Sequence, residues 1–162
     1  MKKSDLKYIK NIRKNILQLT FDAKSSHIGS SLSIVEILYT LYFKKIRKLD
    51  RFILSKGHAA LALYCILYEK GILSKRTIDT FGRDGTSLMA HVSHKVKGVE
   101  FSTGSLGHGL PVSVGKALYF KSNNKKNKVF VVISDGELNE GSTWESLLFA
   151  CHHQLDNLCI IL

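Results

Sequence analysis

The chain has 162 residues, of which 44% are hydrophobic and 23% are charged. This composition is typical of a globular protein with a sizeable core, and it excludes disordered and collagen-like chains. Lys and Arg outnumber Asp and Glu by 24 to 13, so the formal net charge is +11. An anionic partner suits that charge, but a nucleic-acid-binding module is the weakest interpretation, because the basic residues are not interleaved with aromatics and no nucleic-acid motif occurs.

Composition also bears on the compartment. No apolar run approaches the length of a membrane span, and the basic N-terminus leads into a charged helical pattern instead of a signal-peptide core. Cys65, Cys151 and Cys159 have no C-x-x-C spacing and lie among apolar neighbours, as buried free thiols do. We therefore expect a cytoplasmic protein in a reducing compartment, with no membrane partner.

The N-terminal segment predicts two helices separated by a polar break. Residues 6–23 place Leu6, Ile9, Ile16, Leu17 and Thr20 at helical spacing. The segment KSSHIGSS interrupts this pattern with small polar residues. Ser33 and Glu36 have capping-box spacing in front of an apolar run, so a second helix is predicted to begin there.

The middle of the chain predicts a strand, a buried helix and a long loop region. Residues 51–55, RFILS, are short and apolar, as in a strand. The following KGHAALALYCILYEKG predicts a buried helix that ends at Gly71. Residues 72–109 are rich in Gly and Ser, which indicates functional loops with a short helix or two. A helix with Pro111 in its first turn is then predicted from Gly109 to about residue 121.

The last third predicts a strand, a turn, a helix and a second strand. Residues 129–133 are apolar and β-branched, as in a strand buried on both faces, and residues 158–162 are apolar again. Between them Ser142 and Glu145 have capping-box spacing, and an apolar helical face is formed by Trp144, Leu147, Leu148 and Cys151. This order predicts an α/β fold with a parallel sheet and helices on both faces.

The turn after residue 133 is the first candidate site. Asp135 follows a buried strand at the edge where ligands of such sheets bind. A carboxylate there can hold a hard cation beside substrate phosphates, and Gly136 allows the backbone to approach a ligand. The alternative is that Asp135 and Gly136 only form a turn, since Asp-Gly is a common turn dipeptide.

Histidines form the second candidate site. His27, His58, His91, His94 and His108 all lie beside small residues, in loop or helix-start settings. Imidazoles on several turns suit anion binding and proton transfer near neutral pH, although surface loops also carry histidine. A zinc site from His91, His94 and a cysteine matches no established ligand spacing.

Four motifs in order resemble the N-terminal section of transketolase, and in particular the short, separately encoded N-terminal subunits of that family. They are SSHIGSSLSIVEIL, RFILSKGHAALALY, HVSHKVKGVEFSTGSLGHGLPVSVGKAL and VFVVISDGELNEGSTWESLLFACHHQLDNLCIIL. The resemblance covers about residues 9–162. It implies the thiamine-diphosphate-binding fold, with residues 1–162 forming one partial diphosphate-binding domain that is incomplete at its C-terminus.

The resemblance also implies a site for thiamine diphosphate and Mg²⁺. Asp135 corresponds to a Mg²⁺ ligand and Gly136 to the residue against the diphosphate. His58 corresponds to a diphosphate contact, whereas His27 and His91 correspond to catalytic residues that face the substrate. The remaining cofactor-binding positions are Gly104, Ser105 and Leu106, with Gly107 in the loop beside the aminopyrimidine, and Glu140 near a dimer interface.

The implied reaction is two-carbon ketol transfer between sugar phosphates. In the family the active site forms between subunits, and the carboxylate that activates the aminopyrimidine comes from a different domain, which this chain lacks. The resemblance therefore implies a C-terminal partner subunit, in a dimer or heterotetramer.

Two departures accompany the resemblance. Ser134 stands where the family has glycine, whereas His108 stands where many relatives carry glutamine but histidine is also a familiar variant. The chain also stops before the turn that carries the family's second Mg²⁺ ligand. The alternative function is therefore a truncated or decayed remnant without catalytic activity.

Overall fold

The computed structural model describes residues 3–162, which form two compact units. Unit 1 comprises the described part of Met1–Lys45 together with His58–Ser102, and unit 2 comprises Ile46–Gly57 together with Thr103–Leu162. The predicted single partial domain over residues 1–162 stays a prediction.

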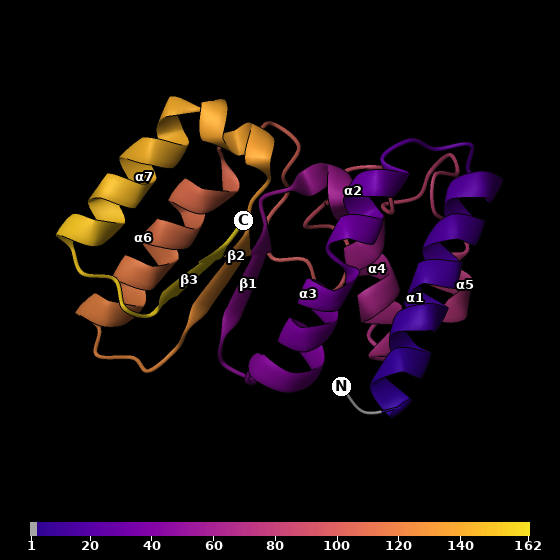
Figure 1. The fold of residues 1–162 in the computed structure, drawn as a ribbon, viewed down its shortest axis with the longest axis horizontal. Coiled ribbons are helices and arrows are strands. Elements are labelled where there is room, and N and C mark those ends of the chain that lie inside the picture. Colours follow the sequence, from indigo (N-terminus) through magenta and orange to yellow (C-terminus); the bar gives the residue numbers. More distant parts are fainter. Residues whose placement is uncertain (1–2) are drawn as a thin grey trace. The chain divides into compact units, whose positions relative to one another are not determined.

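Unit 1 is helical (Figure 1). Its elements are α1 (Lys3–Asp22), α2 (Ile28–Ser33), α3 (Val35–Thr40), the π-helical turn η1 (Leu41–Lys45), α4 (Ala60–Glu69) and α5 (Lys75–Ile78), and the 3₁₀ turn η2 (Gly57–Ala59) links the two units in sequence. The loop region predicted after residue 72 is confirmed, with α5 as its short helix.

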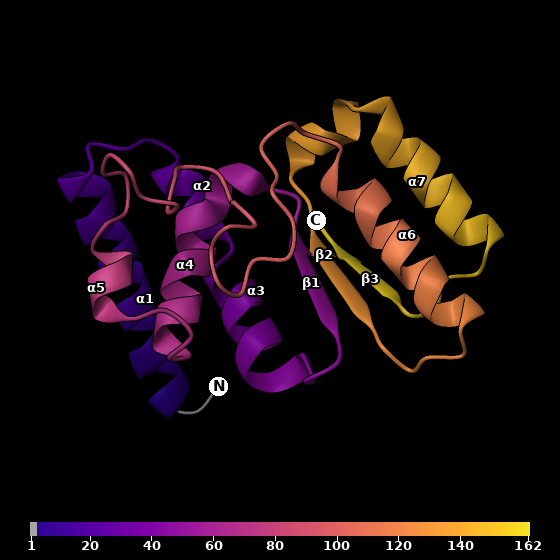
Figure 2. The same cartoon turned by 180° about the vertical axis from the view of Figure 1, so that it is seen from behind.

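The core of unit 1 lies between α1 and α4, which run side by side in both views (Figures 1 and 2). Ile12 and Ile16 on α1 are fully buried, and every residue from Ala60 to Leu67 of α4 is buried. Burying each of these large apolar side chains stabilises the fold by about 1.5–3 kcal/mol. The helix ends as predicted, because Gly71 has a φ of +72° that L side chains rarely adopt.

The predicted capping box before α3 is wrong, and a helix was missed in front of it. The Ser33 hydroxyl donates to the Ser30 carbonyl, and Glu36 forms a bidentate ion pair with Arg13 of α1 at 2.8 Å. The segment expected to be a break contains α2, which begins at Ile28 directly after His27. Glu36 therefore pairs with the distant Arg13 and not with Ser33, the local partner that the spacing suggested.

Unit 2 contains a parallel sheet (Figure 2). Its strands are β1 (Arg51–Leu54), β2 (Val129–Val132) and β3 (Leu158–Ile161) in the order β1-β2-β3, and its helices are α6 (Gly109–Ser122), the 3₁₀ turn η3 (Asp135–Asn139) and α7 (Gly141–His152). Leu54 pairs with Val132, and Val132 with Ile161, so the carboxyl ends of all three strands share one edge. The predicted α/β class, strands and parallel pairing are confirmed.

The helices of unit 2 form a layer against the sheet. Helix α6 packs against all three strands, and α7 packs against α6. The second predicted capping box is wrong, because the Ser142 hydroxyl donates to the Gly107 carbonyl at 2.8 Å. The buried residues of α7 are Thr143, Ser146 and Ala150, whereas its large apolar residues Trp144 and Leu148 are 53% and 72% exposed.

The cysteine prediction holds for one residue of three. Cys65 is buried on α4, and burial raises the pKa of its thiol far above the usual range. Cys151 and Cys159 are exposed, contrary to the prediction, because their apolar neighbours on α7 and β3 are themselves partly exposed. Among residues 3–162, no helix is both long and apolar enough to cross a bilayer.

Candidate functional site

The acidic turn, residues 134–140, lies where the sequence predicts it, after the carboxyl end of β2. The strand ends at Val132, and the chain turns through Ser134 into η3. Asp135, the first residue of η3, is exposed, and Gly136 is half-buried. The carboxylate of Asp135 is therefore accessible at the edge where parallel sheets bind ligands.

Glu137, which the sequence reasoning missed, is fully buried in this turn. Its Oε1 accepts hydrogen bonds from the Gly107 amide at 3.0 Å and from the Ser55 hydroxyl. Its Oε2 accepts from the amide and the hydroxyl of Ser134, at 2.8 and 3.2 Å. A buried carboxylate requires such donors, because they replace the water that solvates it in the unfolded chain.

Ser134, the departure from the family's glycine, is buried and forms a capping box with Glu137. This box was not predicted, although Ser134 and Glu137 have the same spacing as the two pairs that were. The serine side chain points at a protein carboxylate and stabilises the start of η3.

The loop of residues 104–108, called the glycine loop, packs against the acidic turn. Gly107 has a φ of +77°, and a Cβ built on it would lie 2.5 Å from the Ser142 Oγ and 2.8 Å from the Glu140 Cβ. A Cβ built on Gly136 would meet the Leu106 Cδ1 at 3.5 Å, an ordinary contact. The loop and the turn are thus in van der Waals contact, and only glycine fits at position 107.

This packing brings together the predicted cofactor-binding residues of unit 2. Leu106 lies beside Gly136, and Glu140 lies against the glycine that follows Leu106. Gly104 and Ser105 precede Leu106 in the same loop, and Asp135 precedes Gly136.

Three histidines gather in unit 1. The ring centroid of His27 lies 5.5 Å from that of His58 and 5.5 Å from that of His91. His27 precedes α2 with a φ of +66°, His58 belongs to η2, and the backbone carbonyl of His91 accepts a hydrogen bond from the Tyr64 hydroxyl at 3.1 Å. Segments more than 30 residues apart in sequence thus present three imidazoles at one place.

The other histidines have different surroundings. His94 contacts the Ser102 hydroxyl through Nδ1 at 2.8 Å. His108 is exposed before α6, and the rings of His152 and His153 meet edge to face at the end of α7, at an interplanar angle of 88°. In the described range 3–162, no group of three or more His, Cys, Asp or Glu side chains has an arrangement that suits a metal ion.

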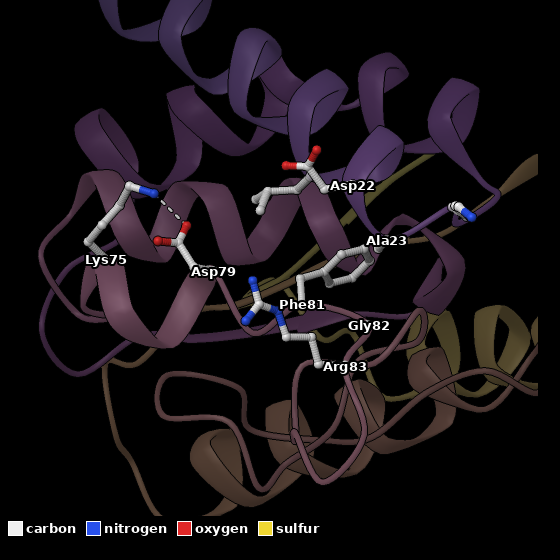
Figure 3. Close-up of a pocket in the computed structure, with 9 residues that line it drawn as sticks. Asp22, Ala23, Lys75, Asp79, Phe81, Gly82 and Arg83 are labelled. Atoms are coloured by element: carbon white, nitrogen blue, oxygen red, sulfur yellow. Dashed lines mark hydrogen bonds and ion pairs between the residues drawn. The ribbon is translucent and has the colours of Figure 1, made fainter.

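Unit 1 also has a polar cavity of about 450 Å³ between the end of α1 and the segment around α5 (Figure 3). Lys75 and Asp79 form an ion pair on its wall. Its lining comprises Leu19, Asp22, Ala23, Lys24, Lys75, Asp79, Phe81, Gly82 and Arg83. None of the predicted site residues is among them, so this cavity is separate from the histidine group.

Comparison with known proteins identifies the family. Residues 4–162 match the family model described as transketolase, thiamine diphosphate binding domain. The chain belongs to the transketolase family. The glycine loop, the acidic turn and the histidine group all lie within the matched range, so the resemblance read from the sequence motifs is confirmed.

Several relatives within the transketolase family are named as subunits. The chain is 43% identical to one subunit of the apulose-4-phosphate transketolase of Actinobacillus succinogenes, over 96% of this chain and 60% of the relative. It is 40% identical to the subunit of the same name from Phocaeicola vulgatus, over 93% of this chain and 57% of the relative. The 6-deoxy-6-sulfo-D-fructose transketolase subunit SqwG of Clostridium sp. is 38% identical, over 95% of this chain and 60% of the relative. The chain thus spans between 57% and 60% of the length of these curated relatives.

Solved transketolases share the fold. The transketolase of Campylobacter jejuni superposes with a TM-score of 0.90 at 28% identity, over 99% of this chain and 28% of that chain. The R525L mutant transketolase of Pichia stipitis superposes with the same TM-score at 30% identity, over 98% of this chain and 26% of that chain.

Proposed function

We propose that this chain is the N-terminal component of a split transketolase-like enzyme, which binds thiamine diphosphate and Mg²⁺ for two-carbon ketol transfer between sugar phosphates. The observation that carries the proposal is the contact between the glycine loop and the acidic turn at the carboxyl edge of the sheet. This contact occurs in a chain that matches a thiamine diphosphate binding domain.

The acidic turn fits a diphosphate with its metal. Asp135 is exposed, and a Cβ built on Gly136 would meet only a methyl group of Leu106, so ligand atoms have room to approach the backbone there. Mg²⁺ is commonly held by one or two carboxylates together with substrate phosphates and water. A single accessible carboxylate beside open backbone is therefore a suitable donor set.

Each predicted site residue of unit 2 has a defined role in the proposal. Asp135 would ligate Mg²⁺ and Gly136 would lie against the diphosphate. Gly104, Ser105 and Leu106 would flank the aminopyrimidine ring, and Glu140 would lie towards a subunit interface. Thiamine diphosphate, when bound, supplies a nucleophilic carbon and an electron sink for carbon–carbon bond cleavage.

The histidine group would act on the diphosphate and the substrate. An imidazole can donate or accept a proton near neutral pH, and its N–H groups bind anionic oxygens. His58 would contact the diphosphate, whereas His27 and His91 would hold substrate hydroxyls and move protons. The two 5.5 Å ring separations support joint action on one ligand.

A C-terminal partner subunit completes the proposed enzyme, in a dimer or heterotetramer. Relatives that are themselves named as transketolase subunits support this, and the chain covers 57–60% of their length. Those relatives are named for apulose 4-phosphate and for a sulfo-fructose, both sugars with a terminal anionic group. We therefore propose phosphorylated sugars as substrates of the assembled enzyme.

Calorimetric titration with thiamine diphosphate and Mg²⁺ tests the proposal, with and without a candidate partner subunit. We expect saturable binding that requires Mg²⁺. Asp135→Ala should lower the affinity for the cofactor at least about 100-fold, because the metal loses its protein carboxylate. Asp156→Ala is the matched control, since Asp156 is an exposed aspartate of the same unit. It should bind as the wild-type chain does.

Two outcomes would count against this function. Absence of binding with and without the partner would favour the alternative, a remnant without catalytic activity. Binding that survives Asp135→Ala unchanged would show that the metal is held elsewhere.

A further inference from the structure

Glu137 connects three segments of unit 2 that are far apart in sequence. Its carboxylate accepts from Ser55 after β1, from Gly107 in the glycine loop and from Ser134 after β2. The Ser55 hydroxyl and the Gly107 amide lie 82 and 30 residues from Glu137 in sequence. One side chain therefore holds together two strand ends and the loop.

Ser55 extends this connection to a fourth segment. Its hydroxyl donates to Glu137 and accepts a hydrogen bond from the Gly109 amide at 3.1 Å. Gly109 is the first residue of α6, so the start of that helix is tied to the same carboxylate through one intermediate. Ser55 is fully buried, and it therefore depends on these protein partners.

Steric fit shows how closely these segments approach. A Cβ built on Gly109 would lie 2.5 Å from the Ser55 Cβ, and one built on Gly107 would lie 2.5 Å from the Ser142 Oγ. The loop has no side chains at these two points that could hold it in place. Its backbone is held by hydrogen bonds: the amides of Gly107 and Gly109 donate to Glu137 and Ser55, and the Gly107 carbonyl accepts from Ser142.

We propose that Glu137 is a positioning residue for the cofactor site, which holds the loop with Gly104, Ser105 and Leu106 in register with the Asp135–Gly136 turn. The proposal rests on the proposed function for the identity of the ligand. The Glu137 side chain is fully buried and therefore acts through the loop and the turn, without contact to the cofactor. Preformed geometry raises affinity, because the ligand does not have to order these segments on binding.

Hydrogen exchange in the cofactor-free chain tests the positioning directly. Glu137→Gln preserves the shape of the side chain but turns one accepting oxygen into a donor, which then faces an amide of Gly107 or Ser134. We expect exchange at one of these amides to accelerate about tenfold or more, as loss of a buried hydrogen bond predicts. Exchange at Val131, inside the buried strand β2, should change less than about twofold.

Two further variants complete the exchange experiment, one as a second test and one as a control. Ser55→Ala removes a donor to Glu137 and the acceptor of the Gly109 amide, so Gly109 should exchange faster even if Glu137→Gln fails to fold. Glu145→Gln makes the same chemical change at an exposed position of α7 and should leave all three amides at wild-type rates.

Cofactor affinity tests the consequence of the positioning. In the presence of Mg²⁺ and the candidate partner subunit, we expect Glu137→Gln to weaken thiamine diphosphate binding about tenfold or more. Faster exchange with unchanged affinity would overturn the positioning role, and unchanged exchange would overturn the hydrogen-bond connection itself. If the wild-type chain bound no thiamine diphosphate, the proposed function would fail, and the exchange rates would still decide whether Glu137 holds the loop.

Discussion

At Gly107 the glycine loop lies against the start of α7. Alanine there would place its Cβ 2.5 Å from the Ser142 Oγ, in a backbone conformation with a φ of +77°. We expect Gly107→Ala to lower the free energy of unfolding by about 2–4 kcal/mol, because conformational strain adds to the steric overlap. Denaturant unfolding monitored by circular dichroism measures this change.

Gly115 provides the matched control for that substitution. It lies inside α6, and a Cβ built on it would meet nothing within 4 Å. Gly115→Ala should therefore stabilise the chain by about 0.5–1 kcal/mol through helix propensity. Equal effects of the two substitutions would show that the fit at Gly107 is looser than its geometry indicates.

Helices α4 and α7 differ in how much their leucines contribute to the free energy of unfolding. Leu63 on α4 is 1% exposed, whereas Leu148 on α7 is 72% exposed. We expect Leu63→Ala to destabilise the chain by about 2–5 kcal/mol and Leu148→Ala by less than about 0.5 kcal/mol. The midpoint of urea unfolding compares the two, and a large effect at Leu148 would mean that the α7 surface is buried in solution.

The elements were predictable where the pattern is local. The β-branched run 129–133 predicted β2 and the apolar run after His58 predicted α4, because strand and helix periods depend on adjacent residues. Helix α2 was missed, since its Gly and Ser residues resemble a loop. Which serine and glutamate side chains pair with each other depends instead on long-range contacts.

The capping boxes illustrate that limit. Three Ser-x-x-Glu pairs occur, and the structure forms the box at Ser134 and Glu137, the pair that was not predicted. Glu36 instead bonds Arg13, 23 residues away, and Ser142 bonds Gly107, 35 residues away. The predicted cofactor residues came from ordered motifs, whereas the partners of Glu137 at Ser55 and Gly107, 82 and 30 residues away, follow from no local pattern.

The whole chain should respond to its ligand as linkage requires. A ligand that binds only the folded chain stabilises it by about 2.7 kcal/mol at 100 times its Kd, which raises Tm by roughly 5–10 °C at this length. We expect this increase with thiamine diphosphate and Mg²⁺ in scanning calorimetry. Chelation of the metal by EDTA should reverse it, and Asp135→Ala should show none; an equal increase in EDTA would contradict a metal-dependent site.

The left-handed backbone of His27 has a consequence for mutagenesis of the histidine group. With φ at 66° and ψ at 23°, this position disfavours alanine for reasons unrelated to the imidazole. Alanine scanning would therefore mix a change in loop conformation with the loss of a proton carrier. Asparagine tolerates this conformation and lacks a group that titrates near neutral pH, so His27→Asn separates the two effects.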